Sequence, residues 1–235
     1  MKKTPQLLNL LSAYKNTLTS DEYQSFTAEV DRLIQHYYDL LNSYKAGAER
    51  AQATHALIEE QIALNEHVKT SCQKGCGACC HLEVEITEDD ADLMARSILS
   101  QSLDYDEGRL QQQASRHRLD PQWAQGTLKS NRCIMLGEDN ACRNYLNRPG
   151  VCRKHSVVTP KEYCETLGAS PIPRLIPMNE IILSAAVSLP QNNFGALPKL
   201  LAQALIRLKD IENIHHMEFT EEASPMAKLP EQNLE

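Results

Sequence analysis

The chain has 235 residues, a net charge of −7 and a pI of about 5.6. Its length suits one large domain or a domain with appendages, and its acidic balance argues against a general nucleic-acid-binding surface. No stretch reaches the roughly 18–20 apolar residues that span a bilayer, and no small-residue cleavage site follows the apolar residues near the start. We therefore expect a globular cytoplasmic protein that binds neither nucleic acid nor a membrane.

The first part of the chain has helical periodicity, and we expect residues 1–70 to form an N-terminal helical arm. Thr4 followed by Pro5 starts one helix, Ser20 is expected to cap a second, and a third should span residues 49–68. In the second helix, apolar side chains recur at spacings close to a heptad seam. We interpret this stripe as packing against the body, or against a protein partner or second copy through the 23–44 helix: Tyr23, Phe26, Val30, Leu33, Tyr37, Leu40 and Tyr44.

Residues 71–168 hold all eight cysteines and mix short elements with irregular chain. Alternation from Leu82 to Ile86 predicts a short strand, and the capping-box-like run that begins at Thr87 starts a helix to about Ser100. A weaker helix is expected at 106–118. Residues 127–164 look irregular, apart from a short helix that begins near Thr159 and Pro160 and carries Cys164.

Three prolines (Pro171, Pro173 and Pro177) indicate a stiff linker after the cysteine-rich module. Two apolar helices are expected beyond it, at about 179–189 and 198–211, within a C-terminal helical part at 169–220. The tail at 221–235 is polar. Alternating strand–helix units are missing from the pattern, so we do not expect a parallel sheet. The predicted fold is mainly α, with an irregular metal-binding module flanked by helices and little β structure.

The cysteines themselves indicate a metal site. Reduced thiols are typical of the cytoplasm, where clustered cysteines bind metal or perform redox chemistry. Disulfides are the alternative that the even number allows, but such scaffolds are usually shorter than about 100 residues. Thiolate is a soft ligand that suits zinc and iron–sulfur clusters, and Gly75 and Gly77 give the first cysteine loop conformational freedom. The predicted metal ligands are Cys72, Cys76, Cys79, Cys80, Cys133, Cys142, Cys152 and Cys164.

Eight thiols suffice for two four-coordinate zinc ions, or for one [4Fe–4S] cluster with four thiols left for zinc or redox chemistry. Cys79 and Cys80 are adjacent, so we expect them to point in different directions and to bind different metals or different irons of a cluster. The sequence does not say which cysteines share a metal.

The polar residues near the cysteines have more than one possible role. His81 and His155 are able to complete a mixed site, although a solvent-facing or hydrogen-bonded imidazole is the more common role. The acidic run from Glu83 to Asp92 is expected to be a solvated face and a favourable helix N-terminus. Arg148 and Arg153 would neutralise an anionic thiolate site, bind an anionic ligand or form a surface pair.

Four motifs in the cysteine-rich part of the chain together form a recognisable pattern. They are Cys76-Gly77-Ala78-Cys79-Cys80, Cys133-Ile134-Met135-Leu136, Cys142-Arg143-Asn144-Tyr145 and Arg148-Pro149-Gly150-Val151-Cys152-Arg153. With these motifs the chain resembles the YkgJ-like CxxCxxCC proteins, whose domain is described as zinc- or iron-chelating and some of whose relatives are associated with flagellin lysine N-methylation. The resemblance covers about residues 72–164. The first cysteine interval is three residues here, against two in the family's name.

We therefore predict a metal-binding protein that holds an iron–sulfur cluster or zinc. One alternative is an iron–sulfur-dependent protein-lysine N-methylase that uses S-adenosylmethionine, which the resemblance alone implies. The Cys72-x3-Cys76-x2-Cys79 interval also occurs in radical S-adenosylmethionine enzymes, but this chain lacks their alternating strands. Gly75-Cys76-Gly77 forms only part of the glycine-rich turn of a doubly wound methyltransferase. A second alternative is a helical interaction protein with a structural zinc.

Overall fold

The computed structural model of the chain describes residues 1–116, 120, 121, 123, 130–166 and 169–222. Over these residues the fold is mainly α, with one two-stranded sheet, which confirms the predicted fold class. The end of the predicted 106–118 helix, the last two residues of the predicted module and residues 223–235 of the polar tail lie outside the described residues. None of the described helices combines the length and apolar character that a membrane crossing requires.

Three helices form the N-terminal part, as predicted. Thr4 caps the first, and its hydroxyl accepts a 3.2 Å hydrogen bond from the Leu7 amide. The second helix begins one position differently from the prediction: Thr19, not Ser20, is the cap. The side chains of Thr19 and Glu22 bond each other's backbone amides in a capping box, so Ser20 is already helical. The bounds are α1 Pro5–Lys15, α2 Ser20–Asn42 and α3 Ala48–Leu64.

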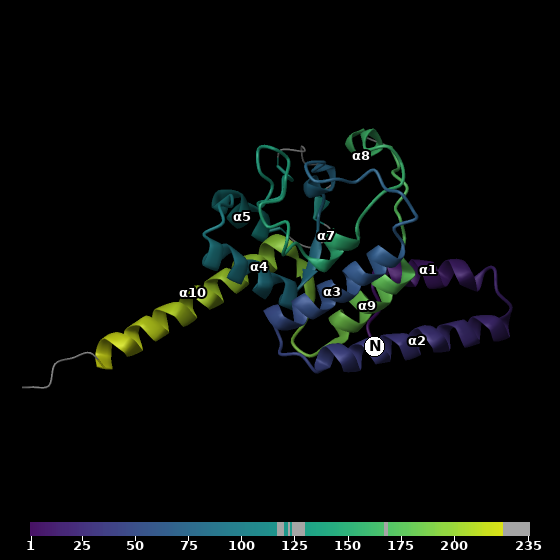
Figure 1. Ribbon diagram of the computed structural model, residues 1–235, viewed down its shortest axis with the longest axis horizontal. Coiled ribbons are helices and arrows are strands. Elements are labelled where there is room, and N and C mark those ends of the chain that lie inside the picture. The colour runs from purple at the N-terminus through teal and green to yellow at the C-terminus, as the bar shows by residue number, and fades with distance from the viewer. Residues whose placement is uncertain (117–119, 122, 124–129, 167–168, 223–235) are drawn as a thin grey trace, which may run out of the picture.

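The apolar stripe of α2 packs within the chain. It lies against α1 and against α9 (Pro177–Ser188), so helices from both ends of the sequence form one base (Figure 1). Ile34 and Leu41 of α2 are completely buried there, whereas Leu40 and Tyr44 are exposed. The packing against the body is confirmed, and the partner at the 23–44 helix stays a prediction. The buried members of this core are Leu7, Leu11, Val30, Ile34, Leu41, Ile181, Ala185, Ala186 and Leu189.

The sheet joins segments that are distant in sequence. β1 (Glu85–Thr87) pairs antiparallel with β2 (Phe194–Ala196), with Ile86 opposite Gly195. Each strand leads into a helix, α4 (Glu88–Gln101) and α10 (Leu197–Glu222) respectively. The strand predicted at residues 82–86 therefore exists close to its expected place, and the sequence pattern did not predict β2.

A second apolar core lies where α4 packs against α10 and where α10 packs against α5 (Glu107–Ala114). Ile86, Ala95 and Leu201 are completely buried in it. Beyond this core α10 continues outward from the rest of the protein, at the lower left of Figure 1. Ile134 and Met135, which follow Cys133, are also buried in this core, so it directly supports part of the cysteine-bearing chain.

The acidic run contradicts the prediction of a solvated face. Asp89, Asp90 and Asp92 are buried, because each has a polar partner from another part of the chain. The Oδ2 atom of Asp89 lies 2.6 Å from Nε of Arg50 in α3, and Oδ1 of Asp90 lies 2.6 Å from Nε2 of His55. The other half of the prediction holds, since Glu88, Asp89 and Asp90 occupy the first turn of α4.

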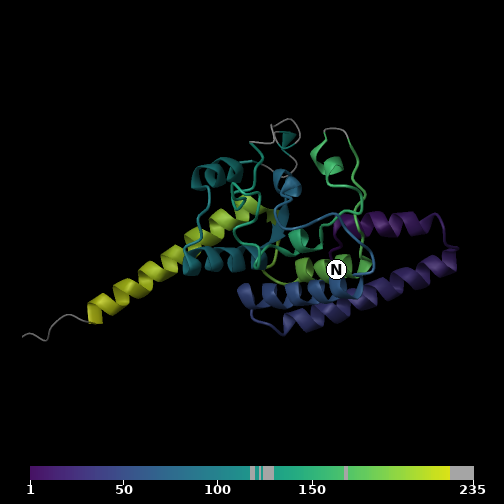
Figure 2. The ribbon, with the colours of Figure 1, turned by 45° about the horizontal axis from the view of Figure 1, so that its top comes forward.

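The cysteine-bearing segments lie together above the helical base (Figures 1 and 2). They contain a 3₁₀ turn, η1 (Ala78–His81), and two short helices, α7 (Gly150–Lys154) and α8 (Glu162–Glu165), joined by irregular chain. Because α9 packs on α2 and α3, N-terminal and C-terminal helices both support this layer. The division into 1–70, 71–168 and 169–220 as domains stays a prediction.

Candidate metal centre

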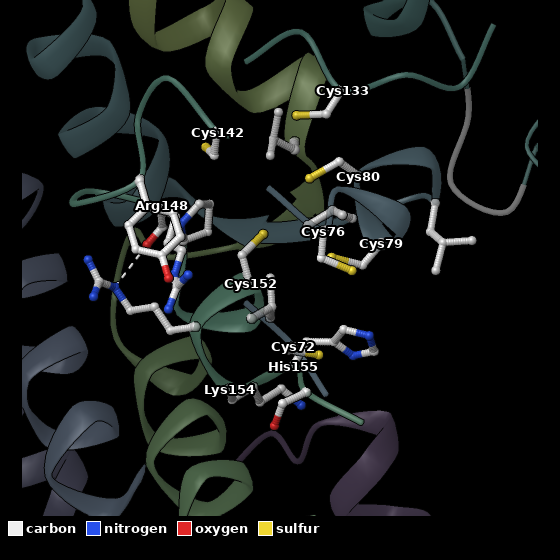
Figure 3. A pocket seen from close by; sticks show the side chains of 18 of the residues that line it. Cys72, Cys76, Cys79, Cys80, Cys133, Cys142, Arg148, Cys152, Lys154 and His155 are labelled. Atoms are coloured by element: carbon white, nitrogen blue, oxygen red, sulfur yellow. Dashed lines mark hydrogen bonds between the residues drawn. The ribbon is translucent and has the colours of Figure 1, made fainter. Parts of the chain in front are cut away.

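Seven of the eight cysteines line one cavity, which we call the cysteine cavity. Its volume is about 540 Å³. Figure 3 shows that the thiols enter it from η1 and the loop before it, from two irregular loops and from α7. The structure thus brings together residues up to 80 positions apart in the sequence, as a shared site requires. The lining cysteines are Cys72, Cys76, Cys79, Cys80, Cys133, Cys142 and Cys152.

The loop before η1 depends on glycine. Gly75 and Gly77 both have positive φ angles, of 86° and 66°, which glycine adopts without steric cost. A Cβ atom at Gly77 would also lie 3.1 Å from the Asn140 carbonyl oxygen. The backbone therefore turns sharply between Cys76 and Cys79 and approaches the opposite loop closely, which places both thiols on the cavity.

Backbone hydrogen bonds fix the loops opposite η1. The Cys133 amide donates to the Cys80 carbonyl over 2.7 Å, so these two cysteines are held side by side. Leu136 and Cys142 form an isolated antiparallel bridge, and the Arg143 amide donates to the Met135 carbonyl over 2.8 Å. Cys133 and Cys142 therefore stand on one hairpin-like segment whose base is in the apolar core.

A buried polar network positions α7, which carries Cys152. Asp90 accepts a 3.2 Å hydrogen bond from the Gly150 amide and also contacts His55. Gly150 leaves no room for a side chain, because a Cβ atom there would lie 3.0 Å from Cδ1 of Ile58 and 3.2 Å from Cδ2 of Leu183. The helix that carries Cys152 is thus bound to both α3 and α4. Sequence reasoning missed this role of Asp90, which is not visible without its distant partners.

The thiols of the cavity favour the protonated state in the absence of a cation. Burial raises the pKa of Cys133 to about 11, raises that of Cys152 well above its usual value and also raises that of Cys142. Cys79 differs: a hydrogen bond from the Cys80 thiol lowers the pKa of Cys79 to about 7. That the Cys79 and Cys80 side chains point in different directions and bind different metals stays a prediction. A metal that binds here has to release protons from these thiols.

Two arginines lie beside the thiols, as predicted, with different partners. The Arg153 side chain already binds other residues of the chain. Its Nη1 lies 2.7 Å from Oε1 of Glu59, and its Nε donates to the Arg148 carbonyl over 3.0 Å. The Arg148 guanidinium stacks over Tyr145, with Cζ 4.2 Å from the ring centroid. Its Nε is buried without a hydrogen-bond partner among the described residues. Arg148 also lines the cavity, so its charge lies close to an anionic occupant.

The other predicted ligands differ in whether they line the cysteine cavity. His155 lines the cavity and His81 does not, and Cys164 on α8 stands outside the lining although α8 packs against η1. Throughout the described chain, no three His, Cys, Asp or Glu side chains converge closely enough to hold a single metal ion. The donor set is nevertheless almost purely sulfur, which suits zinc and iron–sulfur chemistry.

Comparison with known proteins supports this chemistry. Residues 71–167 match the model of the CxxCxxCC family, described as "Putative zinc- or iron-chelating domain". The predicted resemblance is confirmed over this segment, which contains all eight cysteines, and the helical segments on either side lie outside the match. Neither the curated proteins nor the solved structures gave a match to the chain.

Proposed function

We propose that this protein binds a metal centre, an iron–sulfur cluster or zinc, through the thiolates of its cysteines. One observation carries the proposal: seven cysteines from three separate segments of the chain line a single cavity. Structural burial alone does not explain this arrangement, because Cys72 and Cys79 are exposed and none of the eight thiols forms a disulfide. The match to a family described as zinc- or iron-chelating supports the same conclusion.

The cluster form has the stronger support in the deeper part of the cavity. A single zinc needs sulfur atoms within about 2.3 Å of one point, and the described side chains do not converge in this way. A [4Fe–4S] cluster is a larger body that takes one thiolate on each iron. The cavity's volume of about 540 Å³ leaves room for such a body.

The chain's own residues prepare the site for an anionic occupant. Four thiolates around a cluster or a zinc ion leave net negative charge, which a nearby guanidinium stabilises. Arg148 supplies that charge from a position fixed by its stacking on Tyr145. Buried Met135 and the half-buried Val151 give the wall apolar character and restrict water. When bound, an iron–sulfur cluster would supply electron transfer or Lewis acidity at this wall.

The alternatives from the sequence stay predictions. The methylase hypothesis and its S-adenosylmethionine site depend on the resemblance, and the interaction-protein hypothesis depends on a partner for the 23–44 helix. Neither gains a specific contact or cavity from the described residues.

Elemental analysis with an ultraviolet–visible spectrum tests the proposal on the full chain purified without oxygen. We expect iron with matching acid-labile sulfide and a broad band near 400 nm, or stoichiometric zinc without colour, or both. The double variant Cys133→Ser/Cys152→Ser should lose metal and keep its helical circular dichroism, because the helical base does not depend on these thiols. Wild-type protein without iron or zinc would contradict the proposal.

A further inference from the structure

We propose that α5 is a clamp that positions Cys133 for the metal centre. This inference rests on the proposed function. The positioning residues are Gln113, in the last turn of α5, and Arg116, which follows the end of this helix. Both lie outside the lining of the cysteine cavity. They act through the backbone of residues 130–132, which leads directly into Cys133.

The buried side-chain amide of Gln113 spends both of its donors on this segment. Its Nε2 donates to the Ser130 carbonyl over 3.0 Å and to the Arg132 carbonyl over 3.1 Å. A planar amide with two donors holds the two carbonyls in a defined relation to each other. Because Cys133 is the next residue, the direction in which its side chain leaves the backbone is set from α5.

The Arg116 side chain, also buried, adds a second grip on the same segment. Its Nη2 donates to the Ser130 carbonyl over 3.2 Å, and its Nη1 donates to Oδ1 of Asn131 over 3.0 Å. The guanidinium stacks over Trp123, with Cζ 4.5 Å from the ring centroid, and Nδ2 of Asn131 donates to the Trp123 carbonyl over 2.7 Å. Two side chains from the end of α5 therefore hold three successive residues before the cysteine.

The chain on the other side of Cys133 is held by the beginning of α5. The amide of Asp106, the N-cap of this helix, donates to the Ile134 carbonyl over 3.2 Å. Leu110 of α5 is buried in the same apolar core as Ile134. The Cys133 amide donates to the Cys80 carbonyl over 2.7 Å, and Figure 3 shows both cysteines on the same side of the cavity. One helix thus fixes the wall that these two cysteines share.

The residue type at position 113 favours a positioning role over simple packing. Gln113 lies three residues after Leu110, on the same face of α5. An apolar side chain at this position would be buried without the cost of desolvating an amide. The amide is explained by the two carbonyls that it directs. Groups that orient a metal ligand from outside the coordination shell typically contribute about 10–100-fold to metal affinity.

Metal affinity of the full chain, measured by competition with a chelator, gives the first test. Gln113→Met removes both donors and keeps a side chain of similar length. The matched control is Gln112→Met, because Gln112 is exposed on the same helix. We expect a loss of affinity of about 10–100-fold in Gln113→Met and none in the control. Equal affinities in the two variants would overturn the clamp.

Alkylation of the full chain after metal removal separates positioning from general destabilisation. Iodoacetamide is added, and the rate at each cysteine is followed by peptide mass. We expect Cys133 to react about tenfold faster in Gln113→Met than in the control, because two buried bonds that oppose local opening are lost. Cys152, which α7 holds independently, should keep its rate. An equal increase at both cysteines would show general loosening and overturn the positioning role.

A second variant tests the clamp without an apolar replacement at Gln113. Arg116→Lys keeps the charge but loses the forked donors, and it should also accelerate alkylation of Cys133 and not of Cys152. An unchanged rate at Cys133 would count against the grip of Arg116. Failure of the proposed function looks different: the wild-type chain would bind neither iron nor zinc, although the selective effect on Cys133 alkylation would remain.

Discussion

The helical base and the cysteine cavity above it differ in what holds them together. In the base, Ile34, Ile58 and Ile182 are completely buried among helices from both ends of the chain. Around the cavity, by contrast, Cys72 and Cys79 are exposed, and the segments are joined mostly by single backbone hydrogen bonds. The base is stabilised by buried apolar area, whereas the segments of the cavity have cysteines where a core would have apolar side chains.

This difference suggests separate roles for the two regions. Regular helices need no metal to bury their apolar faces, but an irregular layer with few apolar contacts gains much of its order when a metal joins its segments. Asp90 lies between the regions, since it contacts α3 through His55 and α7 through Gly150. Substitutions in each region should therefore have separable effects, except at this joint.

The largest loss of stability is expected on substitution of Asp90. Asp90→Ala would leave the Gly150 amide, His55 and the Thr87 hydroxyl without their buried acceptor. Leaving a buried donor without its acceptor typically costs about 1–3 kcal/mol for each group. Urea unfolding of the metal-free protein should show this loss in the free energy of unfolding. A change below about 1 kcal/mol would contradict the assigned role of Asp90.

The same carboxylate predicts a pH dependence. Burial opposes ionisation of Asp90, but its bonds from His55, Thr87 and Gly150 outweigh burial and lower its pKa. The stability that it contributes is therefore present above the unfolded pKa of about 3.9 and lost as pH falls through the lower folded value. The difference in free energy between wild-type and Asp90→Ala should shrink below about pH 4. A constant difference would contradict an ionised Asp90.

In the base, Ile182→Ala removes a completely buried side chain of α9. Such truncations typically cost about 2–5 kcal/mol. We expect this loss in urea unfolding, with unchanged metal content per folded chain. If the metal content fell in proportion to stability, the stability of the helical base and metal binding in the cysteine cavity would not be independent.

At the foot of α7, Gly150→Ala would place a methyl group 3.0 Å from Ile58 and 3.2 Å from Leu183. Overpacking of this kind typically costs about 1–3 kcal/mol. The matched control is Gly108→Ala in α5, where a Cβ atom meets nothing closer than 3.8 Å. The control should be neutral or slightly stabilising by thermal unfolding, and equal behaviour of both variants would argue against tight packing at α7.

The smallest effect is expected at Arg148, whose loss removes charge and a spare donor but leaves the thiols in place. In Arg148→Ala we expect chelator-driven metal loss about tenfold faster, a difference of about 1.4 kcal/mol. Arg32→Ala is the control, since it removes the same charge from an exposed pair with Glu29. Equal rates in both variants would show that Arg148 does not act on the metal centre.

Local signals made much of the fold predictable. The Thr4–Pro5 start of α1 and the Thr87 capping box of α4 depend on residues within one turn, so the sequence pattern alone indicated them. By contrast, β2 has three residues and exists through its pairing with β1, more than 100 positions away. The burial of Asp89 likewise depends on Arg50 in another helix.

The candidate site, like the fold, could be predicted from the sequence only in part. Clustered cysteines indicated a shared site, and seven of them do line one cavity. The sequence could not show which loops face one another: α8, which carries Cys164, packs against η1, and the Cys133 amide donates to the Cys80 carbonyl. Tyr145 had no distinguishing signal beyond its place in the family motif, yet it positions Arg148.

The central claim is that cysteine thiolates hold the metal, and X-ray absorption at the iron and zinc edges tests it most directly. The measurement uses the full chain as purified without oxygen. We predict a first shell of sulfur at each metal present, with zinc–sulfur distances of about 2.3 Å. A first shell dominated by nitrogen or oxygen ligands at about 2.0–2.2 Å would contradict the account, since it would place the metal away from the cysteine cavity.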